Sequence, residues 1–323
     1  MAGSGRCGNL AYYIFRRVVL LVPVLLVISF ISFALVYLSP GEPARLILQK
    51  ELQGEPSQRQ IDQFNQENGL DKPMLVQYTT WLKKAAVVDF GTSLSTKENV
   101  SVMFRQKFSA SAKLFIVAQL ISLAIALPLG TLVALKPNSR LDNLFRVIAL
   151  AGISLPSFWL GMLLVYIFAV KLHWLPASGY EKPANIILPA LTMGITGAME
   201  LMRLTRTSVM EVLWRNFVRT AKAKGLKDRV ILTQHVLRNA LIPVLTALGL
   251  RVSHMVGGAV IVEMLFAWPG LGRFLVQAAG ERDIPVIQGF VFMSALTFVG
   301  INLVLDLLYV FLDPRITYKT KGG

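Results

Sequence analysis

Four ionisable side chains fall inside long apolar runs of the sequence, where a charge is costly unless it has a partner or a task. Arg251, His254 and Glu263 lie in one run, and Asp306 lies in another. Arg251 and His254 are three residues apart, so a helix places them on one face. Two interpretations stay open. Arg251, His254 and Asp306 line a polar path for a solute, or the arginine pairs with Glu263 or Asp306 and locks helices together.

A second group of candidate residues forms the basic segment, residues 203–243, which lies between two apolar runs. Gly225 is expected to end one short helix in a left-handed conformation, and Asp228 to cap a second short helix. Apolar residues recur at helical spacing before Gly225 and predict one apolar face made of Trp214, Phe217, Val218 and Ala221. A basic element of this kind beside membrane helices faces solvent, touches anionic lipid or binds a partner protein.

The composition places the chain in a membrane. Of its 323 residues, 54% are hydrophobic and only 16% are charged, and the mean hydropathy is +0.57. An ordinary soluble domain is far more polar. The net charge of +15 lies beside the apolar runs, where the positive-inside rule accounts for it without nucleic acid as a partner. The single cysteine, Cys7, is expected to be a free thiol.

Six apolar runs are long enough to cross a bilayer as helices in contact with membrane lipid. Basic residues precede the first run, dominate the connection at residues 136–146 and fill the tail, so both termini and the basic segment are expected in the cytoplasm. The six predicted spans are residues 18–38, 114–135, 144–170, 186–202, 241–266 and 286–312.

This pattern predicts an all-α membrane protein. The expected parts are a cytoplasmic N-terminus with the first span (1–38), a small extracytoplasmic loop region (39–113) and a core of five spans (114–323). The fourth span is short and is expected to continue as a helix through Arg206. Glu200 and Arg203 have the spacing of a helical ion pair. Pro156 predicts a kink or a helix start, and Trp268 an anchor at the membrane interface.

Several kinds of chemistry have no recognisable motif in the chain. There is no Gly-x-x-x-x-Gly-Lys-Ser/Thr loop to hold a nucleotide phosphate. His173, His235 and His254 are scattered and, with one cysteine, do not form a metal-ligand set. No Gly-x-Ser-x-Gly elbow or His-Glu-x-x-His pair is present either, which argues against a hydrolase. The remaining interpretation is a transport function, in which a solute crosses the membrane and the energy comes from an ion gradient or from another subunit.

The sequence resembles the inner-membrane permease subunits of bacterial ABC importers in the dipeptide, oligopeptide and nickel family, nearly from end to end. The most specific similarity lies in the basic segment, in RTAKAKGL and HVLRNALIP. Further matches are GLDKP, QYTTWL and DFGTSL in the predicted outer loop, and FAWPGLGR, RDIPVIQ and DPRI toward the C-terminus. Arg219, Thr220 and Ala221 stand where the general permease loop has an acid and two alanines, a basic version typical of this branch.

The resemblance implies a type I importer permease fold and a mechanism of alternating access in the bacterial inner membrane. The partners implied are a second similar permease, two ATP-binding subunits and an extracytoplasmic solute-binding protein. The chain itself is then no enzyme and needs no cofactor, because ATP and magnesium belong to the ATPases. The residues implied in docking the ATPase are Arg219, Thr220, Ala221, Ala223, Gly225, Leu226, His235, Arg238, Asn239 and Pro243.

The solute and the energy source each leave an alternative. Peptides are the expected solutes, and nickel or a metal chelate is a close second. An ion-coupled secondary transporter or channel would use Asp306 or Glu263 as a proton relay and would work without partner subunits. A membrane scaffold without transport would use the basic segment as a lipid-binding face.

Overall fold

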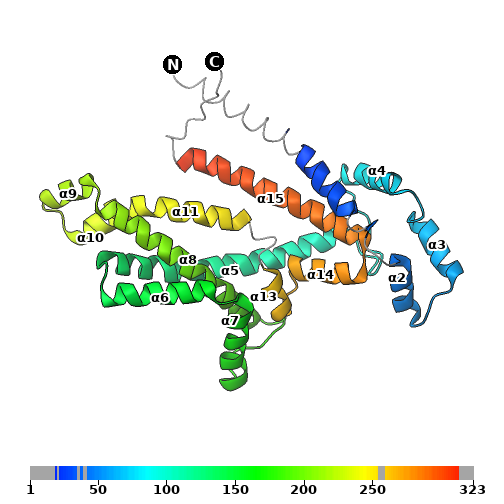
Figure 1. Cartoon of the computed structure of the whole chain (residues 1–323), viewed down its shortest axis with the longest axis horizontal. Coiled ribbons are helices and arrows are strands. Elements are labelled where there is room, and N and C mark those ends of the chain that lie inside the picture. The colour runs from blue at the N-terminus through cyan, green and yellow to red at the C-terminus, as the bar shows by residue number, and fades with distance from the viewer. Residues whose placement is uncertain (1–18, 20–21, 35–36, 39–41, 254–258, 313–323) are drawn as a thin grey trace, which may run out of the picture. The chain divides into compact units, whose positions relative to one another are not determined.

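The computed structural model of the chain describes residue 19 and residues 22–34, 37–38, 42–253 and 259–312 (Figure 1). It divides into two compact units, Met1–Lys107 with Phe274–Gly323, and Phe108–Arg273. Across the described ranges the named elements are all helices, and the remaining pairing is an isolated antiparallel bridge between Thr92 and Asn99. The prediction of an all-α protein is therefore confirmed.

The first unit combines short helices near the N-terminus with a long helix near the C-terminus. It contains the helix Val22–Ala34, α2 (Pro43–Leu52), α3 (Gln58–Asn68), α4 (Met74–Ala85) and α15 (Ile284–Leu312). It also contains the beginning of α5 (Val100–Leu135) and most of α14 (Leu271–Glu281), both of which cross the division between the units.

Helix α3 illustrates how sequence sets the ends of these short helices. Ser57 precedes it, and the Ser57 backbone N–H donates to Gln60 Oε1 at 2.8 Å in a capping box. Gly69 ends the helix at φ +66°, a left-handed conformation that glycine adopts without strain. Ile61 and Phe64 face inward and pack against α2 and the loop at Leu94.

The carboxylate of Asp283 fixes the loop after α4 to the start of α15. Asp283 is buried and accepts hydrogen bonds from Ser93 Oγ at 2.5 Å and from the backbone N–H of Leu94 at 3.2 Å. The Ser95 N–H donates to it as well, at 3.2 Å. A buried carboxylate with several donors holds its surroundings rigidly. The residues 93–95 therefore have a defined position beside α15.

The second unit is built around α8. It contains the rest of α5, α6 (Arg140–Ser154), α7 (Ser157–Leu164), α8 (Ile187–Leu213), α9 (Asn216–Ala223), α10 (Asp228–Val230), α11 (Leu237–Ser253) and α13 (Val260–Leu265). Helix α8 packs against α6, α7 and α11, while α9 and α10 lie at one end of this bundle (Figure 1). The prediction that the fourth span continues through Arg206 is confirmed.

Glycine permits the close approach of α8 to α5. A Cβ built on Gly194 would meet Ile121 Cγ2 at 2.7 Å and the Ala118 carbonyl oxygen at 3.1 Å. A larger residue would push the two backbones apart, as at other helix contacts made through small residues. Small side chains at this contact explain why a Gly-rich stretch forms the centre of the unit.

The predicted span at residues 144–170 is not one straight helix. Its two halves, Arg140–Ser154 and Ser157–Lys171, meet at an angle of 102°. Leu155 is extended at φ −75°, ψ 129°, because the ring of Pro156 disfavours a helical residue before it. The kink predicted at Pro156 is therefore confirmed.

Four helices of the described ranges are long and apolar enough to cross a membrane, and the bent pair raises the number to five. They are Val100–Leu135, Pro183–Leu213, Asp228–Val252 and Ile284–Val304. The helix Val22–Ala34 is apolar but shorter. Two predicted boundaries differ, since the helix of the second span already begins at Val100 and the helix of the fifth span already begins at Asp228. Residues 254–258 of the fifth predicted span lie outside the described part of the chain, and α13 follows at Val260–Leu265.

Candidate functional site

The basic segment (residues 203–243) folds into one short helix between two long ones. Helix α8 runs to Leu213, and the chain becomes extended at Arg215 before α9 begins at Asn216. Gly225 follows α9 at φ +77°, a backbone conformation that favours glycine. The predicted break at Gly225 is confirmed.

The helix after this break is long, whereas the sequence predicted a short one. It begins at Asp228 with Lys227 in the capping position, and it continues to Val252 as one candidate span. Its stretch Ile231–Val236 has π-helical hydrogen bonding before α11 proper begins. The residues near Asp228 and those of α11 therefore belong to one continuous helical stretch.

One side of α9 is anchored in a hydrophobic core. Val218 is 1% exposed, and Ala221 is buried beside it. They pack with residues from the ends of α5 and α8 and from the start of the following helix, namely Ala134, Val209, Ile231, Val236 and Ala240. Burial of this kind holds a short helix that would not be stable alone. The basic segment is therefore a packed element rather than a loose loop.

The other large apolar residues of the segment remain exposed. Trp214 is 69% exposed and Phe217 is 44% exposed, and Leu226 is exposed beyond the turn. The prediction of one apolar helix face is wrong for Trp214, because Trp214 precedes α9. Phe217 does lie on α9, but it remains exposed while Val218 is buried. Exposed large apolar residues on a packed scaffold are candidates for contact with a partner protein.

Most of the predicted docking residues lie on α9 or after it and are exposed. Arg219, Thr220, Ala223 and Gly225 are exposed on or after α9, whereas Ala221 belongs to the core. Farther on, Asn239 Nδ2 donates to the His235 carbonyl at 2.7 Å. Arg238, Asn239 and Pro243 are exposed, and His235 is half-buried. The two motifs RTAKAKGL and HVLRNALIP therefore lie on consecutive helices. Ala221 packs in the core instead of facing outward.

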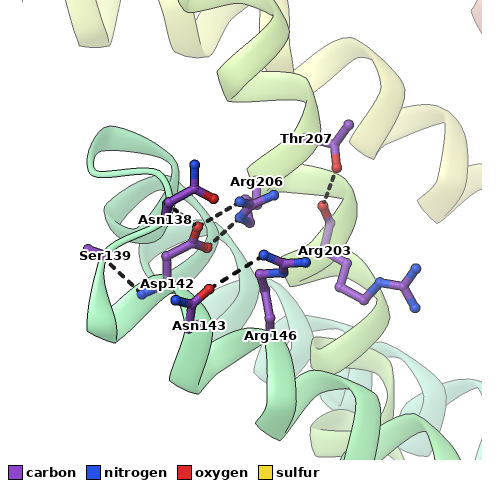
Figure 2. Close-up of polar contacts among 8 residues, drawn as sticks. All are labelled: Asn138, Ser139, Asp142, Asn143, Arg146, Arg203, Arg206 and Thr207. Carbon is purple, nitrogen blue, oxygen red and sulfur yellow. Dashed lines mark hydrogen bonds and ion pairs between the residues drawn. The ribbon is translucent and has the colours of Figure 1, made fainter.

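An ion pair that the sequence did not suggest supports the base of the segment. Arg206 on α8 donates from Nε to Asp142 Oδ1 at 2.5 Å and from Nη2 to Asp142 Oδ2 at 2.7 Å. The Asn138 N–H donates to Asp142 Oδ2 at 2.8 Å, and the Asp142 side chain is completely buried. Figure 2 shows Asp142 and Arg206 facing each other across α6 and α8. A bidentate pair of this geometry is among the strongest hydrogen-bonded contacts.

A second arginine pair lies in the same unit. Arg251 on α11 donates from Nη2 to Glu200 Oε2 on α8, so the expected pair of Glu200 with Arg203 and the alternative pair of Arg251 with Glu263 are both wrong. Glu200 pairs with Arg251 rather than with Arg203, and Arg251 does not pair with Glu263. A Cβ on Gly197 would fall on the Arg251 guanidinium and on Ser122 Oγ. The absence of a side chain at Gly197 therefore makes room for this pair.

The other predicted path residues are placed only in part. Asp306 lies within α15, but its side chain is outside the described part of the chain, and His254 falls outside it altogether. Within the described ranges no group of three or more His, Cys, Asp or Glu side chains is arranged to hold a metal ion.

Glu263 has a structural environment of its own. It is 1% exposed, and its Oε2 accepts the N–H of Gly272 at 2.8 Å and of Arg273 at 3.0 Å. Ser111 Oγ donates to Oε1 at 2.5 Å. The first amides of α14 have no partner within their own helix, so Glu263 satisfies two of them and connects α14 to α5. The expectation that Glu263 faces protein is confirmed.

Trp268 belongs to the same corner of the second unit. It is buried, and its Nε1 donates to the Ala110 carbonyl at 3.0 Å. The sequence interpretation of Trp268 as an interface anchor is therefore wrong, because the indole N–H that an anchor presents to water is used inside the protein.

Comparison with known proteins assigns this arrangement of helices to a class. The profile of the binding-protein-dependent transport system inner membrane component matches residues 126–318, and the N-terminal profile of such membrane components matches residues 10–115. The chain therefore belongs to the binding-protein-dependent transport system inner membrane component family.

Curated relatives match over almost their whole length. The chain is 37% identical to the oligopeptide transport system permease protein AppB of Bacillus subtilis, covering 96% of this chain and 100% of AppB. It is 40% identical to the glutathione permease GsiC of Salmonella typhimurium, covering 95% and 99%. It is 37% identical to the dipeptide permease DppB of Alkalihalophilus pseudofirmus, covering 95% and 99%.

Two solved structures share the fold. The MetNI methionine ABC transporter in an inward-facing form aligns with a TM-score of 0.55 at 19% identity, over 66% of this chain and 97% of that one. An amino acid ABC transporter solved with histidines aligns with a TM-score of 0.52 at 14% identity, over 64% and 93%. The protein is thus a multi-pass permease subunit of an ABC importer in the bacterial inner membrane.

Proposed function

We propose that this permease imports di- or oligopeptides and that the basic segment couples it to ATPase subunits. The substrate class is supported by the relatives, which are permeases of oligopeptide, dipeptide and glutathione transport systems. Nickel or a metal chelate is the weaker candidate, because none of these relatives carries that description. The transported molecule is therefore expected to carry peptide bonds and a free carboxylate.

The observation that carries the coupling proposal is the two-sided character of α9. Val218 and Ala221 anchor it to the ends of the long helices, while Phe217 and the neighbouring Trp214 remain exposed. A partner that binds the exposed side and moves must displace the buried side with it. Packed interiors transmit such displacements because they resist compression.

This proposal implies further subunits that together form the complete importer. Two ATP-binding subunits with ATP and magnesium, a second homologous permease and an extracytoplasmic solute-binding protein complete the assembly. The chain then crosses the membrane six times with both termini and the basic segment in the cytoplasm, the first crossing being residues 18–38. Residues 39–113 form the outer loop region, and residues 114–323 form the core.

We further propose that Arg251 lies on the translocation path, with His254 and Asp306 as additional path residues. Arg251 shares its surroundings with Ser122, and one turn earlier on α5 Gln119 has a buried Oε1 without a partner in the described part of the chain. Polar groups inside a membrane domain commonly mark such a path. A guanidinium there is suited to a peptide carboxylate, which it binds with paired donors.

The coupling proposal is tested at Gly225 with the assembled importer. Gly225→Val is expected to reduce ATP-dependent dipeptide uptake in proteoliposomes at least tenfold, because a β-branched residue resists φ +77°. Gly225→Asn is the matched control. Asparagine enters the left-handed region more readily, so about half or more of the uptake should remain.

No neighbouring atom lies within 4 Å of a Cβ at Gly225, so the substitutions act through backbone conformation and not through a clash. The uptake assay includes unlabelled peptides and nickel as competitors. Normal uptake by Gly225→Val would contradict the coupling proposal. Competition by nickel but not by peptides would contradict the proposed substrate class.

A further inference from the structure

The helix that follows Gly225 contains a stretch whose hydrogen bonding differs from that of an α-helix. Residues Ile231–Val236 are π-helical, and the Leu237 N–H donates to the Leu232 carbonyl, five residues earlier. A π turn contains one residue more than an α turn, and such turns are rare and frequently lie at functional sites. This stretch separates α10 from α11, the helix that packs against α8.

Two buried residues explain why the stretch is wound in this way. Ile231 is 1% exposed and Val236 is fully buried, and both pack in the core that holds α9. In an α-helix, residues five positions apart are separated by about 140° around the axis, so only one of the two could face this core. The additional residue of the π turn brings both onto one face. After Val236 the buried residues Ala240 and Val244 follow at the usual α-helical spacing.

A second residue fits the position that Ile231 occupies in the core. Leu232 lies four residues before Val236, so an α-helix would place Leu232 on the face of Val236 instead of Ile231. Leu232 already packs against the same core from a half-buried position. Because leucine and isoleucine are apolar and equal in size, exchanging one for the other preserves the volume of the core at little cost. The sequence is therefore compatible with two registers of this helix.

Free volume beside these residues gives the displaced side chain a place to go. A cavity of about 550 Å³ is lined by both Ile231 and Leu232, together with the ends of α5 and α8. Its lining also includes Trp214 and Asp228. No atom lies within 4 Å of a Cβ built at Gly225, so the turn before α10 has room to follow. In a close-packed surrounding the same exchange would be blocked.

A second π-helical stretch of the described ranges, Val165–Lys171, lacks these features. None of its residues is buried, and its helix ends at Leu172 without a further helical continuation. A change of its register would therefore turn no following helix.

We propose that residues 231–236 form a register joint, through which α10 shifts by one residue relative to α11 when ATPase subunits move the basic segment. In one register Ile231 lies in the core and the stretch is π-helical. In the other register Leu232 takes its place and the stretch is α-helical. The change turns Asp228 by about 100° around the helix axis and moves it by about 1.5 Å along that axis. This inference rests on the proposed coupling to ATPases and names the residues at which that motion reaches α11.

Deletion of Gln234 tests the register joint, because it removes the additional residue and keeps both buried anchors. Gln234 is exposed, and its deletion leaves Ile231 and Val236 four residues apart, so both stay buried in an ordinary α-helix. The variant should assemble with its ATPases and unfold at an unchanged or higher temperature. Its ATP-dependent dipeptide uptake in proteoliposomes should fall roughly tenfold or more, because the second register is no longer available.

Gln234→Ala is the matched control, since it removes the same side chain but keeps the additional residue. It should transport as the unchanged chain does. Equal uptake by the deletion variant and by Gln234→Ala would overturn the proposal, because the second register would then not be used. Failure of the deletion variant to assemble would overturn it as well, because the additional residue would then hold the fold instead of permitting a shift.

Two leucine variants test the second register separately. Leu232→Ala removes the side chain that fills the core in the α-helical register, whereas Leu237→Ala truncates another half-buried leucine that packs against the same core. Both should destabilise the chain to a similar extent, but only Leu232→Ala should lower uptake roughly tenfold. Leu232→Ile keeps an apolar side chain of the same size and should transport normally. Equal losses of uptake in the two alanine variants would contradict the proposal.

Amide hydrogen exchange detects the register joint without any partner subunit. Because the two registers differ by an exchange of similar side chains, the full chain in phosphatidylcholine nanodiscs samples both. The amides of residues 232–237 should therefore exchange roughly tenfold faster than in the deletion variant. Equal exchange in the two chains overturns the register joint, and peptide uptake by the assembled importer would still support the proposed function. Fast exchange that the deletion removes, in an importer without peptide uptake, would support the joint and contradict the function.

Discussion

The two arginine pairs of the second unit join the same kinds of charged group, but they differ in what surrounds them. The Asp142 side chain is fully buried and accepts from Arg206 and from the Asn138 N–H. The Glu200 side chain, by contrast, is 70% exposed in its pair with Arg251. Burial makes the first pair costly to break, whereas exposure leaves the second pair cheap to break.

This difference assigns the two pairs different tasks. The Asp142–Arg206 pair connects the start of α6 to α8 shortly before the basic segment, so it serves as a fixed support (Figure 2). The Arg251–Glu200 pair lies where the glycine at position 197 leaves room beside it. If Arg251 lies on the proposed path, a solute carboxylate would compete with Glu200 for its guanidinium.

The largest expected effect is on the buried pair. Asp142→Asn should lower the free energy of unfolding by about 3 kcal/mol, because it leaves the Arg206 guanidinium without its counter-charge. SDS-induced unfolding in mixed micelles, followed by circular dichroism, measures this loss. Arg206→Lys keeps the charge but not the two parallel hydrogen bonds. Its free energy of unfolding should lie between those of Asp142→Asn and the unchanged chain. A loss as small as that of Glu200→Gln would remove the distinction between the pairs.

The second effect is on transport rather than on stability. Glu200→Gln should change the free energy of unfolding by less than about 1 kcal/mol, since its side chain is exposed. Peptide uptake should fall several-fold, because Arg251 loses the group that positions it. Exchanging the charges with Glu200→Arg and Arg251→Glu tests this further. Restored uptake in that double variant would show that Arg251 only pairs and does not meet the solute.

The smallest expected effect is on a surface pair within the basic segment. Lys222 Nζ and Asp228 Oδ1 are 3.9 Å apart across the turn at Gly225, and both side chains are largely exposed. Lys222→Ala should change the free energy of unfolding by no more than about 0.5 kcal/mol. A destabilisation comparable to that of Asp142→Asn would mean that exposure is a poor guide to the strength of these pairs.

Local signals in the sequence predicted much of the fold. Helical periodicity and apolar length indicated the membrane helices, Gly225 indicated the break after α9, and Pro156 indicated the bend between α6 and α7. These features depend on residues close together in the chain, where backbone conformation and side-chain spacing act directly. The family followed from motifs that are also local.

Contacts between residues that lie far apart in the sequence could not be predicted from it. Asp142 and Arg206 are far apart in the sequence, and nothing near either residue names its partner. Glu200 had a plausible neighbour in Arg203 but pairs with Arg251, because the packing of α8 against α11 decides which groups meet. Trp214 was assigned to the apolar face of α9 because helical spacing was extended past Arg215, where the backbone is not helical.

The length of the helix from Asp228 to Val252 means that a small tilt at one end displaces the other end by several ångströms. Its 25 residues form a rod about 37 Å long at the usual rise per residue. If the rod turns by about ten degrees around the end near Gly225, Arg251 at the other end travels about 6 Å, more than one helical turn. A slight tilt at the proposed docking end would therefore be enough to carry the guanidinium from one set of neighbours to another.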